Sequence, residues 1–280
     1  MKKISRRSFL AAAAVSAAAL ALTACGGSAS TASSAAASSV AASSEAASTS
    51  AAAAELTTVE AGKLTMATNA AFPPYEMTTD AGEFEGIDID TAKAIAEKLG
   101  LELQIDDMDF DAALLSVQQG KADIVMAGVT VTDERKAVMD FSDSYATGIQ
   151  SIIVPNDSDI ASPDDLAGKK IGTQRGTTGY IYCSDDFGDE NVVAYDDGLT
   201  AVQALNNGQV DAVVIDNAPA QEFVAANPGL KVLDTSYAEE DYAIGMAKGS
   251  ALEDAVNKAL EELKADGTLQ AIVDKYINAN

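Results

Sequence analysis

Arg135 and Asp216 carry the side chains whose chemistry is most informative in this chain. The planar guanidinium of Arg135 is suited to hold a carboxylate through two parallel hydrogen bonds. The carboxylate of Asp216 is suited to hold an ammonium group, and burial of either ligand charge without such a partner would be very costly. Each residue also has a plainer interpretation. Arg135 would be an exposed charge on a helix, and Asp216 the N-cap of a helix that contains Pro219, a role compatible with ligand binding.

Two similar segments are expected to position these groups. They read LLSVQQGKADIVMAG, ending at Gly128, and AVQALNNGQVDAVVID, ending at Asp216, and they lie 88 positions apart. Gly120 corresponds to Gly208, and each glycine is the expected stop signal of a helix that precedes an apolar strand. In open α/β sheets ligands bind at the carboxyl ends of strands. The repeat therefore predicts two similar lobes that face one cleft.

The alternation of strand and helix patterns continues along most of the chain. It predicts an α/β fold of two lobes, each a mostly parallel sheet flanked by helices, with two hinge crossings between them. The expected crossings are residues 146–149 and 241–244. Residues 59–147 with 244–280 form the first expected lobe, and residues 148–243 form the second. The expected strands are 63–69, 101–105, 122–126, 149–154, 170–173, 192–195, 212–215 and 242–247, and the expected helices are 87–99, 111–119, a short helix capped by Thr132, 177–182, 199–206, 219–226, 252–263 and 269–277.

Five motifs, in this order, resemble the polar amino acid-binding proteins of ABC importers. This is solute-binding protein family 3, which includes glutamine, histidine and lysine/arginine/ornithine receptors. The resemblance covers the chain from about Lys63 to its end and implies the two-lobed, type II periplasmic-binding-protein fold. The motifs are ATNAAFPPYE (67–76), MDF (108–110), AGVTVTDERKAVMDFSDSY (127–145), GTQRGTTG (172–179) and DAVVIDNAP (211–219).

The resemblance implies a set of ligand-binding residues around Arg135 and Asp216. Backbone groups of Ala127 and Gly128 and the hydroxyl of Thr130 complete the polar cage, while Phe72 and Phe110 form aromatic walls and Tyr75 supports them. The turn at 176–179 begins a helix, and a helix N-terminus is suited to bind a carboxylate. Taken by themselves, the glycines of this turn would also suggest a phosphate-binding loop. The full set is Asn69, Phe72, Phe110, Ala127, Gly128, Thr130, Arg135, Gln174, Thr177 and Asp216.

Three positions depart from the related receptors and bear on specificity. Asn69 stands where several glutamine and basic amino acid receptors have Asp, Gln174 replaces the Lys of the glutamine receptor, and Ile215 replaces its His. These changes favour a neutral polar side chain in the ligand. A cationic side chain bound through Glu76 or Asp109 is the alternative, and plain solvent exposure is the simpler interpretation of both acids.

The first 24 residues are expected to be an export signal rather than part of the fold. A basic start precedes an Ala-rich apolar stretch and Leu22-Thr23-Ala24-Cys25, which resembles a bacterial lipobox with Cys25 as the lipidated residue. Ser5 to Leu10 also resembles a twin-arginine signal, and both export routes remain open. Residues 25–58, rich in Ser and Ala, are predicted to form a flexible tether. The protein is therefore expected outside a membrane, held there by its lipid.

Composition excludes several other classes of function. The net charge of −25 becomes −29 when the signal peptide leaves with four basic and no acidic residues. Such acidity argues against nucleic acid as a partner. The chain has no His, which excludes His-dependent triads and His metal sites. No metal, cofactor or structural disulfide is expected, and Cys183 is predicted to be a buried apolar residue.

The sequence therefore predicts a monomeric, lipid-anchored receptor that presents an L-amino acid to an ABC transporter permease. It is not expected to be an enzyme, because no nucleophile–base pair is visible. Three alternatives stay open: a dehydratase-like enzyme on the same fold, a sensory module, and a receptor for another zwitterionic solute.

Overall fold

The computed structural model describes residues 56–277. The predicted signal peptide, the lipidation site Cys25 and all but the last three residues of the predicted tether lie outside the described residues. Leu56, one of those three, already packs against the core of the first lobe. Within residues 56–277 no helix combines the length and the apolarity that a membrane crossing requires.

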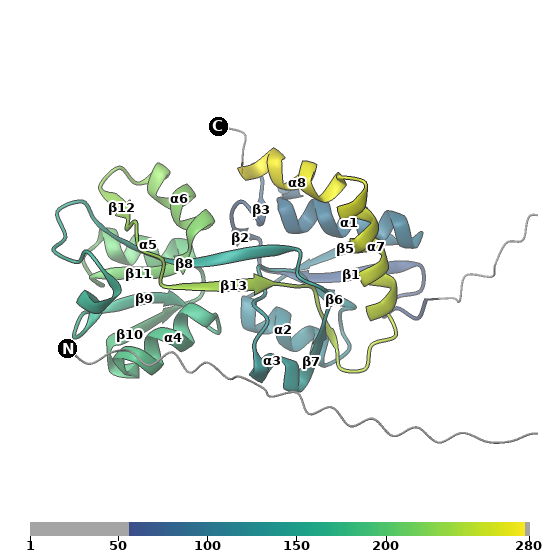
Figure 1. The fold of residues 1–280 in the computed structure, drawn as a ribbon, viewed down its shortest axis with the longest axis horizontal. Coiled ribbons are helices and arrows are strands. Elements are labelled where there is room, and N and C mark those ends of the chain that lie inside the picture. Colours follow the sequence, from purple (N-terminus) through teal and green to yellow (C-terminus); the bar gives the residue numbers. More distant parts are fainter. Residues whose placement is uncertain (1–55, 278–280) are drawn as a thin grey trace, which may run out of the picture. The chain divides into compact units, whose positions relative to one another are not determined.

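The described chain forms two lobes, each built on one sheet (Figure 1). The first sheet has the order β5 (Glu102–Asp107), β1 (Lys63–Thr68), β6 (Ile124–Val125), β14 (Gly245–Ala247), β7 (Met139–Phe141). The second has the order β10 (Val192–Tyr195), β9 (Ile171–Gln174), β11 (Ala212–Asp216), β8 (Ala146–Pro155), β12 (Leu230–Val232), with β13 (Ala238–Tyr242) also paired to β8. A small third sheet contains β2 (Ala71–Phe72), β3 (Glu76–Thr78) and β4 (Phe84–Glu85).

Helices cover both faces of each main sheet, which gives each lobe two apolar cores. On the first sheet, α1, α7 and α8 pack together on one face, and α2 packs on the other around Phe110 and Val117. On the second sheet, α5 and α6 contribute to one core, while α4 contributes Cys183 to the other. Cys183 is fully buried, as predicted. The helices are α1 (Ile87–Leu99), α2 (Phe110–Gln118), α3 (Asp133–Val138), α4 (Thr178–Phe187), α5 (Gly198–Asn206), α6 (Asn217–Ala226), α7 (Glu253–Ala265) and α8 (Thr268–Ile277), with 3-10 turns at Pro163–Leu166 and Asp189–Asn191.

The 88-residue repeat is a structural repeat. Strands β5, β1 and β6 are parallel in the first lobe, as are β10, β9 and β11 in the second, and α2 and α5 are offset by 88 positions at both ends. The matching positions of Asp123 and Asp211 in the two copies of the repeat have a structural cause. Asp123 accepts a hydrogen bond of 2.8 Å from the backbone N–H of Thr65, and Asp211 accepts one of 2.7 Å from that of Lys170. Each carboxylate thus fastens the start of one strand to its parallel neighbour.

The two-lobed fold with mostly parallel sheets is confirmed, and in each main sheet of the described chain one strand runs against all the others. In the first sheet β14 pairs antiparallel with both β6 and β7, and in the second β8 pairs antiparallel with β11, β12 and β13. The reason is the hinge. A strand that enters a lobe from the other lobe, rather than by a helical crossover, runs against the strands of the repeat.

The hinge consists of β8 and β13, which run side by side as an antiparallel pair (Figure 1). Their register pairs Tyr242 with Ala146 and Ala238 with Gln150. The single strand predicted over 242–247 was wrong in one respect. β13 ends at Tyr242 in the second sheet, and the chain joins the first sheet only at Gly245. The chain therefore passes twice between the sheets, close to the crossings predicted from the sequence.

Candidate ligand-binding site

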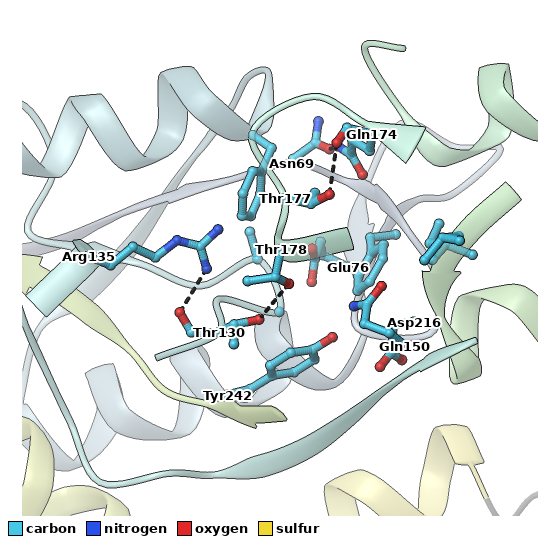
Figure 2. Close-up of a pocket in the computed structure, with 16 residues that line it drawn as sticks. Asn69, Glu76, Thr130, Arg135, Gln150, Gln174, Thr177, Thr178, Asp216 and Tyr242 are labelled. Carbon is cyan, nitrogen blue, oxygen red and sulfur yellow. Dashed lines mark hydrogen bonds between the residues drawn. The ribbon is translucent and has the colours of Figure 1, made fainter. Parts of the chain in front are cut away.

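One pocket lies between the two lobes, and all the predicted ligand-binding residues line it (Figure 2). Arg135 enters from one side and Asp216 lies on the opposite side, while Asn69 and Gln174 lie together at a third corner. The pocket is lined by Asn69, Phe72, Glu76, Phe110, Ala127, Gly128, Thr130, Arg135, Gln150, Gln174, Thr177, Thr178, Val214, Ile215, Asp216 and Tyr242.

Arg135 is a buried guanidinium, and no carboxylate among residues 56–277 forms an ion pair with it within 4 Å. Thr132 caps its short helix by accepting the backbone N–H of Arg135, as predicted. Nη1 donates to the carbonyl of Thr130 at 2.8 Å and Nη2 to that of Gly176 at 3.1 Å, across the cleft. Burial lowers the pKa of Arg135, but a guanidinium keeps its charge in proteins. Its remaining donors are therefore free to bind an anion in the pocket.

Asp216 has both roles considered for it, helix cap and pocket carboxylate. One oxygen accepts the N–H of Ala218 at 3.1 Å, which caps α6, and the other accepts the N–H of Ile149 on the hinge strand β8 at 2.6 Å. The hydroxyl of Tyr242 is a third donor. Burial raises the pKa of Asp216 to about 6, and these three donors oppose the rise. Near pH 7 the group is therefore largely a carboxylate, suited to a ligand ammonium.

The polar wall at the end of β6 differs from expectation in one respect. The backbone N–H of Gly128 donates to Asp88 at 3.0 Å and so does not point into the pocket. Gly128 has φ +55°, and a Cβ there would come within 2.9 Å of the ring of Phe72 and 3.2 Å of that of Tyr242. Glycine is thus required by the aromatic rings around it and by the backbone conformation. The close approach of a ligand, which the sequence suggested, is not its main cause.

Aromatic rings surround the middle of the pocket. Phe110 is buried, and the guanidinium carbon of Arg135 lies 5.4 Å from its ring centre. Phe72 packs against cores of both lobes. Tyr75 stacks on Phe72 at 5.7 Å and does not line the pocket, so it supports the wall from behind.

Asn69 and Gln174 form an amide pair that joins the lobes. Gln174 Nε2 donates to Asn69 Oδ1 at 2.8 Å and to the carbonyl of Asp196 at 3.3 Å, while Asn69 Nδ2 donates to the carbonyl of Met108 at 3.0 Å. Backbone carbonyls only accept hydrogen bonds, so these contacts fix which way both amides point. Gln174 Oε1 is left as an acceptor at this corner of the pocket.

Comparison with known proteins agrees with this geometry. The family model of the bacterial extracellular solute-binding proteins, family 3, matches residues 64–279. The chain belongs to this family. The solute-binding protein is 33% identical to the L-cystine-binding protein TcyJ of Escherichia coli (strain K12) over 225 residues, which cover 79% of this chain and 85% of TcyJ.

Solved structures of related proteins share the two-lobed fold. An ancestral arginine-binding protein bound to glutamine has a TM-score of 0.74 and 43% identity, covering 77% of this chain and 98% of that protein. The amino acid ABC transporter substrate-binding protein AbpA from Streptococcus pneumoniae, bound to L-arginine, has a TM-score of 0.72 and 38% identity, covering 76% of this chain and 94% of AbpA. The solute-binding protein thus has relatives that bind amino acids and serve ABC transporters.

Glu76 and Asp88 form a buried carboxyl pair beside the pocket of the solute-binding protein. Both side chains are fully buried, and only Glu76 lines the pocket. Burial, followed by the nearby charge of Asp88, raises the pKa of Glu76 well above its usual value. Burial raises the pKa of Asp88 to about 6, against hydrogen bonds from Gly128, Tyr145 and Glu76. Glu76 is therefore not the exposed acid that the sequence suggested, and its raised pKa favours the protonated form. Asp109, by contrast, is exposed and outside the pocket.

Sequence reasoning missed several residues that line the pocket. Thr178 follows the predicted Thr177, and its place in the same turn was a usable signal. Gln150 and Tyr242 come from the two hinge strands, where only the pairing of β8 with β13 brings them to the site. Gln150 is a polar residue just before the apolar run at residues 152–154 of β8, and its place there was the one available hint.

Proposed function

We propose that this solute-binding protein is a lipid-anchored receptor that captures an L-amino acid with a neutral polar side chain and delivers it to an ABC transporter permease. The observation that carries the proposal is the buried guanidinium of Arg135, which has no ion pair within 4 Å among the described residues and lies across one pocket from the carboxylate of Asp216. A buried charge requires a counter-charge. A free amino acid supplies a counter-charge to each residue.

The binding mode follows from the three corners of the pocket. Arg135 holds the ligand carboxylate, with the N-terminal turn of α4 at Thr177 beside it. Asp216 and Thr130 hold the ammonium group, together with backbone carbonyls at Ala127 and Gly128. The ligand side chain runs between Phe72 and Phe110 toward Asn69 and Gln174.

The neutral character of the side-chain end supports a neutral ligand. Asn69 and Gln174 are amides, and Ile215 adds apolar surface. Glu76 also lines the pocket, and burial followed by the charge of Asp88 raises its pKa well above its usual value, which favours its neutral form. In its neutral form Glu76 offers no charge of opposite sign to a cationic ligand side chain.

Closure of the lobes accompanies capture. Hydrogen bonds join the two lobes between Arg135 and Gly176 at 3.1 Å, between Gln174 and Asn69 at 2.8 Å, and between Thr130 and Thr178 at 3.3 Å. Bending at the hinge strands would open these contacts and admit the ligand. We propose that the closed monomer is what the permease recognises, and that a lipid on Cys25 keeps the receptor beside its transporter.

A thermal-shift screen tests the receptor role. The domain from Glu55 onward should be heated with each of the twenty amino acids, with L-ornithine and with L-cystine. A ligand at 100 times its dissociation constant adds about 2.7 kcal/mol of stability, so one or a few neutral polar amino acids should raise the melting temperature clearly. A rise in melting temperature only with Lys, Arg or ornithine would contradict the proposal that the ligand side chain is neutral. No rise with any amino acid would contradict the receptor proposal itself. Chemical change of a stabilising compound would favour a dehydratase-like enzyme.

Asn69→Asp should shift the preference toward cationic ligands. The carboxylate would still accept from Gln174, and it would place a negative charge at the side-chain end of the pocket. We expect the affinity ratio of L-arginine to L-glutamine, measured by calorimetry, to rise at least about tenfold, or about 1.4 kcal/mol. Asn156→Asp, which adds the same charge at an exposed residue outside the pocket, is the control. An unchanged ratio in Asn69→Asp would mean that the side chain does not reach this corner.

A further inference from the structure

Glu240 lies on the hinge strand β13, immediately behind the pocket. Its side chain is buried, with 5% of its surface exposed, and its backbone pairs with Gly148 of β8. It does not line the pocket, but its Oε2 contacts two residues that do. Thr130 Oγ1 donates to it at 3.1 Å from the first lobe, and Gln150 Nε2 donates at 3.0 Å from the second. One carboxylate therefore holds polar groups of both lobes.

These contacts determine which atom is the donor and which the acceptor in each hydrogen bond around Thr130. A carboxylate only accepts hydrogen bonds, and a threonine hydroxyl has a single proton to give. Because Thr130 gives that proton to Glu240, Thr178 must be the donor in the 3.3 Å contact between Thr178 and Thr130. The remaining lone pair of Thr130 Oγ1 is an acceptor, and Thr130 lines the pocket.

The same reasoning applies to Gln150. Its amide nitrogen is bound to Glu240, which leaves Oε1 as the atom that remains to be satisfied. Oε1 is buried and has no hydrogen-bond partner in the described structure. A buried amide oxygen without a donor costs free energy until a donor arrives. Gln150 lines the pocket, so the ligand is the obvious source of that donor.

We propose that Glu240 is a positioning residue for the ligand ammonium group. By accepting hydrogen bonds from Thr130 Oγ1 and Gln150 Nε2, it makes both side chains present oxygen atoms to the ligand. The ammonium site then consists of acceptors from Asp216, Thr130 and Gln150, while Arg135 is the donor for the carboxylate. This arrangement admits the zwitterion in one orientation only. The inference rests on the proposed function in that the ligand is an amino acid.

Glu240→Gln tests the proposal. The new amide donates as well as accepts, so Thr130 is free to turn its proton toward the pocket and oppose an ammonium group. Calorimetry with the domain from Glu55 onward would compare L-glutamine with glutaramic acid, which lacks the α-amino group, and L-arginine with 5-guanidinopentanoic acid. We expect the preference for the amino acid over its analogue to fall about tenfold in the variant, through weaker binding of the amino acid alone.

Glu239→Gln is the matched control, because Glu239 is the exposed neighbour on the same strand and the substitution removes the same charge. It should leave the preference unchanged. An equal loss of affinity for amino acid and analogue in Glu240→Gln would reveal a merely structural role and overturn the proposal, as would wild-type affinity for both. If the wild type binds neither amino acid, that result counts against the proposed ligand. A crystal structure of the unliganded wild type then decides the inference, since absence of the Thr130–Glu240 hydrogen bond would refute it.

Discussion

Arg135→Ala should abolish amino acid binding while the domain remains folded. Arg135 is the cation that faces the pocket, and its guanidinium also donates to the carbonyl of Gly176 across the cleft. The substitution removes both the partner of the ligand carboxylate and one contact that closes the lobes. Truncation of one member of a buried charge pair costs about 2–5 kcal/mol. We therefore expect the affinity measured by calorimetry to fall at least about a hundredfold, or about 2.8 kcal/mol.

Two further variants separate charge from geometry. Arg135→Lys keeps the charge but loses the planar fork, so it should bind more weakly than the wild type and more tightly than Arg135→Ala. Arg175→Ala should bind normally, because Arg175 is exposed and pairs with Asp196 at 3.0 Å outside the pocket. Full-strength binding by Arg135→Ala would show that the carboxylate lies elsewhere, and the orientation of the ligand proposed here would then be wrong.

The repeated half of each lobe was predictable from the sequence because its signals are local. A helix that ends at Gly120 or Gly208 and is followed by an apolar strand is defined within about fifteen residues, and both glycines have φ +66°. The pairing of the hinge strands β8 and β13 was harder to predict from the sequence. β13 has the sequence AEEDY, whose acids are depleted in strands, and it forms because its backbone pairs with β8 about ninety residues earlier. Such long-range pairing leaves no periodic pattern in a single sequence.

The same distinction applies to the site. Residues at strand ends and in the turn before α4 could be placed together from motifs and from the rule that ligands bind at strand ends. Gln150 and Glu240 could not, since each is a polar residue in a hinge strand and only the register of β8 with β13 brings them into contact. The raised pKa of Glu76 could not be predicted from the sequence either. It depends on full burial and on Asp88, twelve positions away.

Glu76→Gln should stabilise the unliganded protein at neutral and alkaline pH. Both oxygens of Glu76 and Oδ1 of Asp88 lack an N–H or O–H donor among the described residues, yet the two carboxyl groups are within hydrogen-bonding range of each other. A proton on Glu76 is thus the donor between them. Beyond burial, the groups that most strongly affect the pKa of Glu76 are the acids Asp88 and Asp107, and no cation is among them. The charge of Glu76 in turn raises the pKa values of Tyr75 and Tyr145. A glutamine keeps the shape and the donor but has no proton to lose.

The direction of the pH effect follows from the raised pKa. Between the unfolded pKa of Glu76, about 4.3, and its higher folded value, the folded state binds more protons than the unfolded state. The free energy of unfolding therefore falls as pH rises through this range. Asp88 and Asp216, whose pKa values are raised to about 6, contribute a fall of the same sign that is largely complete by pH 7. The decline that remains at higher pH belongs to Glu76 and should be absent in Glu76→Gln.

Urea unfolding of both proteins at intervals from pH 5 to 8 measures this difference. At pH 8 the variant should be more stable by at least about 1.4 kcal/mol, the free energy of one pKa unit, and the gap should narrow toward pH 5. Glu83→Gln, at an exposed residue, should leave the curve unchanged. Because Gln preserves the neutral hydrogen-bonding character of the position, binding of a neutral amino acid should also be retained. A variant less stable than the wild type at pH 8 would mean that Glu76 is ionised in the folded protein. A negative charge on this wall of the pocket would then favour a ligand with a cationic side chain.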